Sequence, residues 1–281
     1  MEWFRGKKVC VTGGSSGIGQ AAAMMLAKAG AEVALVARGA ERLEAVQRAM
    51  LEVQPEGRFP IFALDVSDRA QVQAVAPTIL AALGGLDVLI NNAGVTHPGF
   101  IQDIEDAVFD QMMAINYMGT VHMTRAMLPH FIGQKAGHIC NVSSMLGFMG
   151  IYGYTAYAAS KFAITGFSEC LRQEMLPHQV RVSLVFPPDT DTPQLAAENQ
   201  IKPAETKAIA GNVKVLSPEA VAQEMLQGIR RGRFWILPGF GSKFTHFMMR
   251  HFPTTVRWFI DGDLMRYRRR AASVPDAGRQ G

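Results

Sequence analysis

Short apolar runs alternate with longer amphipathic segments along most of the chain. The short runs are typical of buried strands, and the longer segments repeat apolar residues with the spacing of helices. The predicted strands are Lys8–Thr12, Glu32–Ala37, Phe59–Asp65, Leu86–Asn91, Gly137–Ser143 and Val180–Phe186. The predicted helices are Gly17–Ala29, Glu41–Val53, Arg69–Leu83, Asp106–Leu128, broken near Pro129, and Tyr157–Leu176.

This alternation predicts an α/β fold. Strands separated by helices form βαβ units, whose right-handed crossovers build a parallel sheet with helices on both faces. We expect a single doubly wound, Rossmann-type domain over residues 1–229 and a C-terminal extension over residues 230–281. The polar segment Asp189–Val215 follows the sixth strand, at the edge where this fold binds ligands. It is predicted to be a substrate lid, with an ordinary surface excursion as the alternative.

The composition is that of a globular chain with its positive charge at one end. Of the 281 residues, 48% are hydrophobic and 19% are charged, which supports a large core and excludes global disorder. The net charge is +4, but residues 230–270 carry ten Lys and Arg against two Asp. Cys10, Cys140 and Cys170 show no metal-binding spacing, which favours free thiols in a reducing compartment. Because the sequence shows no apolar leader and no long apolar run, we expect a cytoplasmic protein. Because the cysteines lack metal-binding spacing, we expect no metal site.

A glycine-rich turn follows the first predicted strand. Gly13, Gly17 and Gly19 lie in the sequence GGSSGIG, directly before a predicted helix. Glycines there let the backbone approach a pyrophosphate, and the helix N-terminus supplies N–H donors and a positive dipole end. Ser15 and Ser16 add hydroxyl donors. The turn therefore predicts a dinucleotide site.

The end of the second predicted strand indicates which dinucleotide is bound. Enzymes that use NAD carry an acidic residue here for the adenosine ribose, whereas Arg suits a 2′-phosphate. The chain has Arg38 at this position and Arg42 one turn later. A guanidinium matches phosphate geometry with two hydrogen bonds, so we expect NADP(H). The alternative is a pair of solvated basic residues at the start of a helix.

Two further predicted strands end in polar motifs. Asp65, in LDVSD, can accept a hydrogen bond from an adenine amino group. NNAG, at residues 91–94, can support the centre of the sheet and border the adenosine ribose. Either motif alone is equally compatible with an ordinary turn.

Tyr157 and Lys161 supply the candidate chemistry. They are four residues apart in YAASK and therefore share one face of a helix. An ammonium near a phenol stabilises the phenolate, so we expect Lys161 to lower the pKa of Tyr157 and prepare it for proton transfer to a ketone. Ser144, in NVSSM, lies thirteen residues upstream. The spacing alone also occurs in solvated helix faces, so it gains meaning only from the other motifs.

These motifs together resemble the short-chain dehydrogenase/reductase family. TGGSSGIG, LDVSD, NNAG, INYMG, NVSSM and YAASK occur in the order and spacing of that family over residues 7–190. The resemblance implies a catalytic tetrad of Asn116, Ser144, Tyr157 and Lys161. It gives Tyr157 the role of proton donor, Ser144 that of substrate hydrogen-bond donor, Lys161 that of nicotinamide-ribose ligand, and Asn116 that of support for a water.

The same resemblance completes the expected set of cofactor contacts. The predicted set is Gly13, Ser15, Ser16, Gly17, Ile18, Gly19, Arg38, Arg42, Asp65, Val66, Asn92, Ala93, Gly94, Tyr157, Lys161, Pro187 and Thr190.

The segment after the sixth strand departs from the commonest family pattern. Many members have Pro-Gly there, whereas this chain has FPPDTDTP at residues 186–193. This run, LVAR and YTAYAASKFAITG are similar to the 3-ketodihydrosphingosine reductases, which reduce a long-chain β-keto amine with NADPH. The expected reaction is therefore reduction of 3-ketodihydrosphingosine to dihydrosphingosine. The alternatives are another carbonyl substrate (a 3-oxoacyl thioester, a steroid or a xenobiotic) or a non-catalytic nucleotide-sensing module.

The C-terminal extension combines aromatic and basic residues. Eight aromatic residues lie within residues 234–259, interleaved with Lys and Arg. Phe244, Phe247 and Met248 have the spacing of a helical stripe, which fits an interfacial helix on anionic lipid. Capping of the substrate crevice and an oligomer contact are the alternatives, and no nucleic-acid module accompanies the basic run. The family resemblance further implies a dimer or tetramer through the helices over residues 106–128 and 157–176.

Overall fold

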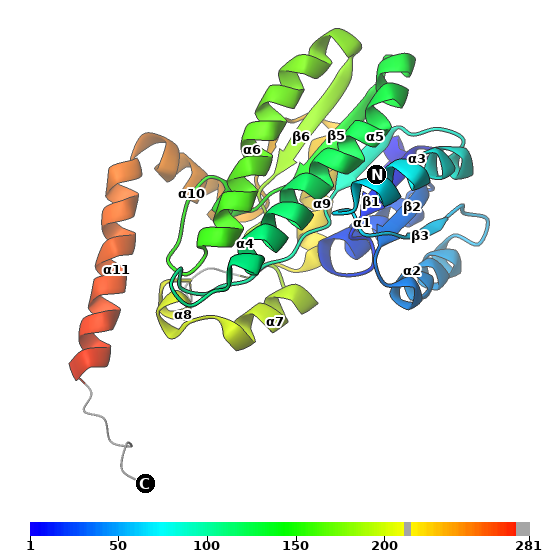
Figure 1. The fold of residues 1–281 in the computed structure, drawn as a ribbon. Helices are drawn as coiled ribbons and strands as arrows, with labels where there is room; N and C mark the ends of the chain where they lie inside the picture. Colours follow the sequence, from blue (N-terminus) through cyan, green and yellow to red (C-terminus); the bar gives the residue numbers. More distant parts are fainter. Residues whose placement is uncertain (211–214, 274–281) are drawn as a thin grey trace.

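The computed structural model of the chain describes residues 1–210 and 215–273 and contains a seven-stranded parallel sheet (Figure 1). The order across the sheet is β3-β2-β1-β4-β5-β6-β7, and every pairing is parallel. The predicted α/β doubly wound class is therefore confirmed. The strands are β1 (Lys8–Thr12), β2 (Glu32–Ala37), β3 (Ile61–Ala63), β4 (Val88–Asn91), β5 (Gly137–Val142), β6 (Val180–Val185) and β7 (Trp235–Ile236).

Helices connect the strands and extend beyond the last of them. They are α1 (Gly17–Lys28), α2 (Ala40–Val53), α3 (Arg69–Leu83), α4 (Asp106–Met112), α5 (Gly119–Gln134), α6 (Thr155–Met175), α7 (Pro193–Ile201), α8 (Ala204–Ala210), α9 (Pro218–Arg230), α10 (Gly239–His251) and α11 (Pro253–Ser273). Short turns of other helix types are η1 (Glu2–Phe4), η2 (Met113–Met118), η3 (Met145–Gly147) and η4 (Leu176–His178). Helices α7 and α8 lie in the predicted lid, of which residues 211–214 are outside the described residues.

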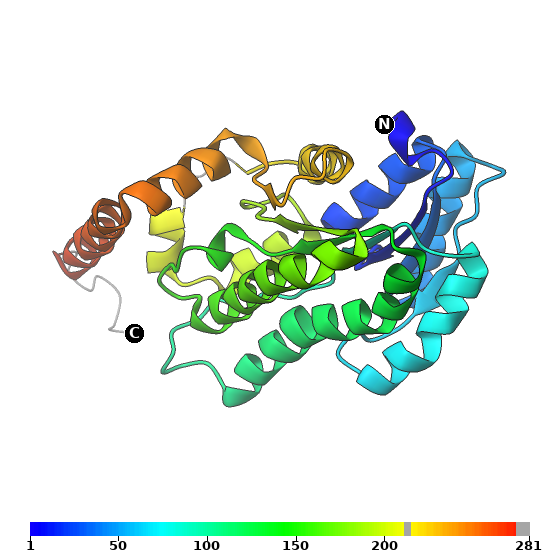
Figure 2. The same cartoon turned by 90° about the horizontal axis from the view of Figure 1, so that it is seen from above.

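Helices cover both faces of the sheet (Figure 2), and an apolar core lies between the sheet and the helices on each face. Side chains of α1, α2 and α9 pack on one face, and side chains of α3, α5 and α6 pack on the other. Strand β1 shows how the sequence produces this division. Val9 and Val11 belong to the first core and Cys10 to the second, because successive strand residues point to opposite faces.

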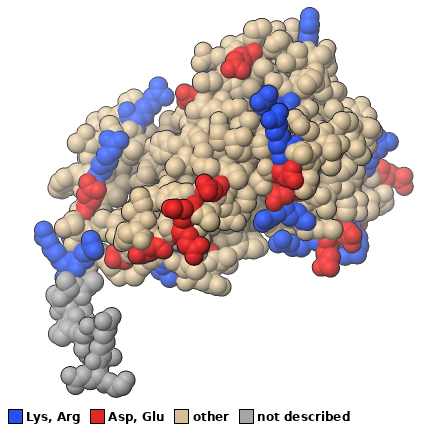
Figure 3. Space-filling model, in the orientation of Figure 1, with Lys and Arg blue, Asp and Glu red and all other residues tan. Residues whose placement is uncertain are grey.

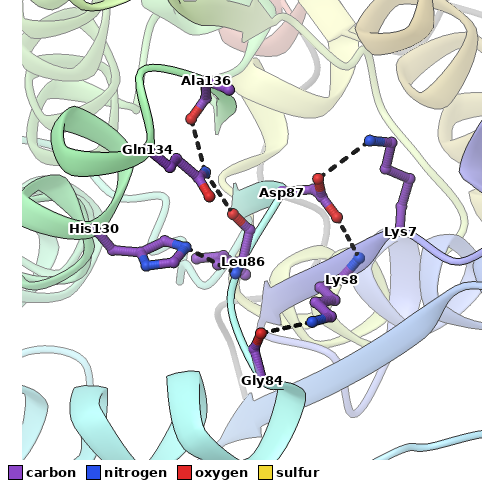
Figure 4. Close-up of polar contacts among 8 residues, drawn as sticks. All are labelled: Lys7, Lys8, Gly84, Leu86, Asp87, His130, Gln134 and Ala136. Atoms are coloured by element: carbon purple, nitrogen blue, oxygen red, sulfur yellow. Dashed lines mark hydrogen bonds and ion pairs between the residues drawn. The ribbon is translucent and has the colours of Figure 1, made fainter.

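Polar contacts fasten the sheet at the amino-terminal ends of β1 and β4 (Figure 4). The Asp87 carboxylate accepts hydrogen bonds from the Lys8 backbone N–H at 2.9 Å and from the Lys7 ammonium at 3.1 Å. From α5, His130 accepts the Leu86 N–H at 3.0 Å, and Gln134 donates to the Leu86 carbonyl at 2.9 Å. These contacts hold the sheet together at the edge away from the glycine-rich turn.

At the opposite edge of the sheet, the connections that follow the paired strands β1 and β4 run in different directions. The chain passes from β1 to β2 on one side, and β4 lies on the other side of β1. The connections that leave the carboxyl ends of β1 and β4 therefore diverge, which creates the crevice where doubly wound proteins bind ligands.

The structure corrects the prediction for the fourth helix. In place of one helix broken near Pro129, α4 and α5 are joined by a π-helical turn, η2, and α5 continues through Pro129 to Gln134. The break near Pro129 was therefore wrong. Met127 and Phe131, on either side of Pro129, are fully buried, and this packing outweighs the hydrogen bond that proline cannot make.

The sheet also differs from the sequence prediction at its two edges. Strand β3 is shorter than the predicted Phe59–Asp65, although the Arg58 and Pro60 carbonyls still accept hydrogen bonds from β2. Strand β7 was not predicted, because two residues are too few to show a strand pattern. It pairs with β6 and carries the sheet past residue 229, into the segment that the sequence indicated as an extension.

Beyond β7 the chain forms an arm of two helices, α10 and α11, which projects from the side of the domain (Figures 1 and 2). The inner side of this arm packs on the domain: α11 contacts α8, and Met249 and Ile260 pack with Leu146, Met149 and Tyr154. The arm is therefore attached beside the carboxyl-terminal edge of the sheet.

Candidate active site

The glycine-rich turn forms a close backbone cradle after β1. Gly13 and Gly17 have φ angles of +66° and +54°, which favour glycine. A Cβ atom on Gly19 would lie 2.3 Å from the Gly13 carbonyl oxygen and 2.5 Å from the Asn92 amide nitrogen. Ser16 is the N-cap of α1 and makes no side-chain capping hydrogen bond. The turn thus leaves room and donors for a pyrophosphate at the helix N-terminus, so the residues present fit a dinucleotide.

Thr12 ties the turn to the end of β4. Its hydroxyl accepts the backbone N–H groups of Asn92 and Ala93, both at 3.0 Å. The Asn92 side chain donates to the Thr12 carbonyl at 3.1 Å. These hydrogen bonds connect the turn that contains Gly13 to residues 91–94, so the two segments form one surface at the bottom of the crevice. Sequence reasoning missed Thr12, although its place at the start of TGG was available as a signal.

Arg38 and Arg42 stand at the end of β2 and in the first turn of α2. Both are exposed, and neither forms an ion pair with another residue in ranges 1–210 and 215–273. The Arg42 Nε atom lies 3.3 Å from where a Cβ on Gly39 would be, so the side chain folds back over that glycine. The two guanidinium groups are therefore free to receive an anion at this edge of the crevice.

Asp65 and Val66 lie just after β3. One Asp65 oxygen accepts from the backbone N–H and the hydroxyl of Ser67, at 2.9 and 2.6 Å, which fixes the carboxylate. Val66 is buried, and its methyl group lies 2.6 Å from where a Cβ on Gly119 would be. Because Asp65 remains partly exposed, its other oxygen can accept a further hydrogen bond.

Tyr157 and Lys161 extend from α6 toward the same cavity as Ser144 of the η3 N-cap. The Lys161 nitrogen lies 5.7 Å from the centre of the Tyr157 ring and donates to the Val142 carbonyl at 3.1 Å. The Ser144 hydroxyl accepts the Leu146 N–H at 3.1 Å, which orients it at the start of η3. Three members of the predicted tetrad therefore meet in one place.

Burial determines the proton affinities of this group. It raises the pKa of Tyr157 far above its ordinary value, and the Ser144 hydroxyl offsets part of the rise. Burial also lowers the pKa of Lys161 to about 8. The net lowering of the Tyr157 pKa that we expected from Lys161 is not found, because burial of the phenol is the largest influence on its pKa. Tyr157 is consequently a protonated phenol at neutral pH, as a proton donor must be.

Asn116 lies in the π-helical turn η2, behind the cavity wall. Its amide oxygen accepts the Val95 N–H at 2.8 Å, and its amide nitrogen donates to Ser160 at 2.9 Å. A Cβ on Gly94 would meet the Asn116 oxygen at 3.1 Å and the Lys161 nitrogen at 3.3 Å. Asn116 and Lys161 thus lie next to Gly94. The π-helical turn η2 positions the Asn116 amide beside this glycine, and such turns are frequent at functional sites.

A cavity of about 340 Å³ joins these features. The predicted residues that line it are Gly13, Ser16, Gly17, Ile18, Asn92, Ala93, Gly94, Ser144, Tyr157, Lys161, Pro187 and Thr190. The predicted residues that do not line it are Ser15, Gly19, Arg38, Arg42, Asp65, Val66 and Asn116. Gly19 and Asn116 instead support the wall, and the two arginines and Asp65 follow β2 and β3, away from Tyr157.

The side of the cavity beyond Tyr157 is more apolar. It is lined by Met149, Ile151, Ile209 and Ile260, together with Thr245. Thr245 belongs to α10 and Ile260 to α11, so the projecting arm completes the cavity wall. Sequence reasoning named capping of the crevice as an alternative for this segment but did not identify these two residues.

A buried polar cluster lies in the same wall and was also missed. The Tyr154 hydroxyl donates to Glu198, and the Lys202 ammonium pairs with Glu198 at 2.8 Å, with all three side chains almost fully buried. Asp189 lies nearby on the loop after β6. In the sequence, Glu198 and Lys202 resemble an ordinary exposed i,i+4 pair, so only the structure shows that they belong to the site.

A phenol, an ammonium and a hydroxyl at the mouth of a dinucleotide cradle define a nicotinamide-dependent oxidoreductase that acts on a ketone or secondary alcohol. A family model described as short chain dehydrogenase matches residues 7–203. The chain belongs to the short-chain dehydrogenase/reductase family, as its motifs indicated, and it is an enzyme, not a non-catalytic nucleotide-sensing module.

Curated relatives agree with this assignment. The chain is 38% identical over 232 residues to the 3-ketodihydrosphingosine reductase of Bos taurus, covering 82% of this chain and 70% of that protein. It is 39% identical over 234 residues to the 3-dehydrosphinganine reductase of Danio rerio, with the same coverage. It is also 36% identical over 230 residues to a fatty acyl-CoA reductase of Acinetobacter baylyi, covering 81% of this chain and 74% of that protein.

Solved structures of the family carry nicotinamide cofactors. A short-chain dehydrogenase/reductase from Burkholderia phymatum in complex with NAD has a TM-score of 0.74 and 28% identity, covering 83% of this chain and 89% of that one. A metagenomic short-chain oxidoreductase in complex with NADP has a TM-score of 0.67 and 33% identity, covering 80% and 90%. A nicotinamide dinucleotide is therefore the cofactor class of this chain.

None of the helices in the parts of the chain that the structure describes has both the length and the apolar composition to cross a bilayer.

Proposed function

We propose that the protein is an NADPH-dependent reductase of 3-ketodihydrosphingosine or a closely similar long-chain amino ketone. The observation that carries this proposal is the position of Tyr157, the proposed proton donor, between two parts of the site. On one side is the dinucleotide-binding turn with Arg38 nearby, and on the other is a largely apolar part of the cavity that includes Ile260 of the arm. The names of the 3-ketodihydrosphingosine reductase relatives support it.

The residues divide the chemistry between them. The cofactor, when bound, supplies the hydride. Tyr157 donates a proton to the ketone oxygen as negative charge develops there, and Ser144 donates a hydrogen bond to the same oxygen. Lys161 provides positive charge beside the phenol and a donor for the nicotinamide ribose. Asn116 holds the wall next to Lys161 and a water that links this ammonium to solvent.

Arg38 and Arg42 support the choice of NADPH over NADH. Their side chains are exposed after β2, where folds of this kind hold the adenosine ribose, and neither forms an ion pair with an acidic residue among the described residues. A 2′-phosphate matches the two-pronged donors of a guanidinium.

Turnover with a defined substrate tests the reaction. Purified protein should oxidise NADPH when given 3-ketodihydrosphingosine, and Tyr157→Phe should remove most of the rate. Tyr152→Phe is the matched control, because Tyr152 packs on Phe100 outside the cavity and should keep full activity. A clear preference in kcat/KM for a 3-oxoacyl thioester, a steroid or a xenobiotic ketone would reject the amino-ketone assignment.

We further propose that the arm binds an anionic membrane surface. Phe240, Phe244, Phe247, Trp258 and Phe259 are each more than half exposed. Figure 3 shows Lys and Arg side chains spaced along the same arm, and the exposed Lys and Arg residues of the arm are Lys243, Arg250, Arg257, Arg266, Arg268, Arg269 and Arg270. Exposed aromatic rings beside basic groups suit the interface of an anionic bilayer, where a long-chain ketone would reside.

Vesicle sedimentation separates membrane binding from the alternatives. The protein should sediment with vesicles that contain phosphatidylserine, less with neutral phosphatidylcholine, and less at high salt. Changing both Phe244 and Phe247 to Ser should remove sedimentation, whereas Phe162→Ser on α6, which is also exposed, should not. Equal binding to anionic and neutral vesicles would reject the proposal. If the variant with Phe244 and Phe247 changed to Ser formed smaller oligomers than the wild type, these residues would belong to an assembly contact instead.

A further inference from the structure

Two carboxylates stand in the wall of the cavity that holds Tyr157. Asp189 lies on the loop after β6, and Glu198 lies in α7. They belong neither to the tetrad nor to the dinucleotide cradle, and the reaction described above assigns them no role. Charged groups are rarely buried without a partner, so their presence beside the reacting tyrosine requires an explanation.

The charges of this cluster do not balance. Glu198 is matched by Lys202, at 2.8 Å, and also receives the Tyr154 hydroxyl. Asp189 is mostly buried, yet within ranges 1–210 and 215–273 its carboxylate has no hydrogen-bond or ion-pair partner. Lys161, the other ammonium of the cavity, donates to the Val142 carbonyl. The Asp189 carboxylate therefore faces the cavity without a hydrogen-bonded or ion-paired partner among the described residues, and the Lys202 charge acts on it only from a greater distance.

We propose that Asp189, with the Glu198–Lys202 pair behind it, forms the subsite for a primary ammonium on the carbon next to the substrate ketone. This inference rests on the proposed function and adds to it the residue that selects amino ketones over neutral carbonyl compounds. An ammonium has three donors and full positive charge, so it satisfies a carboxylate that the protein leaves unpaired.

The position of the carboxylates suits this substrate. In an α-amino ketone the nitrogen is two bonds from the carbonyl carbon, so the ammonium must lie close to the group that protonates the ketone. Asp189 and Glu198 line the same cavity as Tyr157, and their negative charges add to the rise in the pKa of the phenol that burial causes. A bound ammonium would offset this effect and make Tyr157 a stronger acid only when the correct substrate is present.

The remaining cavity accommodates the rest of such a molecule. Met149, Ile151, Ile209 and Ile260 provide apolar surface for an alkyl chain. A neutral thioester or steroid would bury the same apolar area but would leave Asp189 desolvated and unpaired, which is costly. The cavity therefore rejects neutral ketones as well as binding amino ketones.

Kinetics on paired substrates test the subsite. The probes are 3-ketodihydrosphingosine and the same long-chain ketone without its amine, each with saturating NADPH. Asp189→Asn should lower kcat/KM for the amino ketone by about tenfold to a hundredfold, the range for a lost hydrogen bond to a charged group. It should leave the amine-free ketone unchanged or better. Asp189→Glu should restore much of the preference.

Asp191→Asn is the matched control, because Asp191 is exposed on the same loop and lies outside the cavity lining. It should leave both substrates unaffected. An equal loss on both ketones in Asp189→Asn, or no loss on either, would overturn the subsite while leaving the proposed reaction standing. A wild-type enzyme that prefers the amine-free ketone would overturn both.

If the protein shows no turnover, the affinities of the wild type and Asp189→Asn for an amine-bearing ligand test the subsite. The affinity of the NADPH-loaded wild type for a long-chain 2-amino-1,3-diol should exceed that of Asp189→Asn by at least tenfold, by calorimetry. Equal affinities would refute the subsite. Absence of turnover with a retained difference in affinity would reject the proposed reaction but support the subsite.

Discussion

Replacing Lys161 with Met should make the protein more stable while removing its activity. Lys161 is almost fully buried, and burial lowers its pKa from an ordinary value of 10.5 to about 8. At about 1.4 kcal/mol for each pKa unit, the protonated side chain costs the folded state about 3 kcal/mol at pH 7. Methionine removes this cost but leaves the Val142 carbonyl without its donor, a loss of about 1 kcal/mol. The expected net gain at pH 7 is about 2 kcal/mol.

The pH dependence gives the sharper test of this reasoning. Between pH 8 and pH 10.5 the unfolded chain still holds a proton on Lys161 that the folded chain has lost, so wild-type stability rises with pH in this window. The advantage of Lys161→Met should therefore shrink by about 1 kcal/mol between pH 8 and pH 9. Urea unfolding without cofactor, at half-unit steps from pH 7 to pH 9.5, measures this difference.

Lys28→Met is the control, because Lys28 is exposed at the end of α1 and its variant should follow the wild type at every pH. Parallel stability curves for Lys161→Met and wild type across this range would refute the argument, since they would mean that Lys161 titrates alike in both states. Loss of turnover in the more stable variant would show that the buried ammonium is kept for function at the expense of stability.

Three other substitutions test separate parts of the structure. Gly19→Ala would place a methyl group 2.3 Å from the Gly13 carbonyl oxygen, so it should weaken NADPH binding at least tenfold, and an unchanged Kd by fluorescence titration would contradict the cradle geometry. Arg38→Asp should weaken NADPH far more than NADH, and an equal loss for both would mean that Arg38 does not contact the 2′-phosphate. Phe186→Ala removes a fully buried ring stacked on Trp235 at 4.5 Å and should cost about 3–5 kcal/mol in urea unfolding. A loss below about 1 kcal/mol would show that this stack is not part of the core.

Local pattern and short motifs were sufficient to predict the central sheet and three of the residues that meet in the cavity, Ser144, Tyr157 and Lys161. Strands such as β2 and β4 are short, largely apolar runs, and Tyr157, Lys161 and Ser144 lie in motifs that can be recognised in the sequence alone. Their meeting in one cavity follows from the order of parallel strands, which the alternation of elements already implied.

The features that were missed depend on long-range packing. Strand β7 has two residues and gains its hydrogen bonds from β6, so no local pattern marks it. Pro129 remains helical because its neighbours are buried. The Glu198–Lys202 pair has the spacing of a surface pair and becomes part of the site only because α7 packs over the cavity. Local propensity contains none of this information.

The arm has a consequence for how substrate range can change in this family. The dinucleotide floor is built from Gly13 to Gly94, early in the chain, whereas Thr245 and Ile260 come from helices after the last strand. The dinucleotide part of the cavity and its wall from the arm are thus encoded by separate stretches of sequence, which come together only in the folded protein. Exchange of the last 43 residues between relatives would present a new wall to the ketone and leave the hydride chemistry intact. A chain shortened before Gly239 would keep the catalytic residues and lose part of its selectivity.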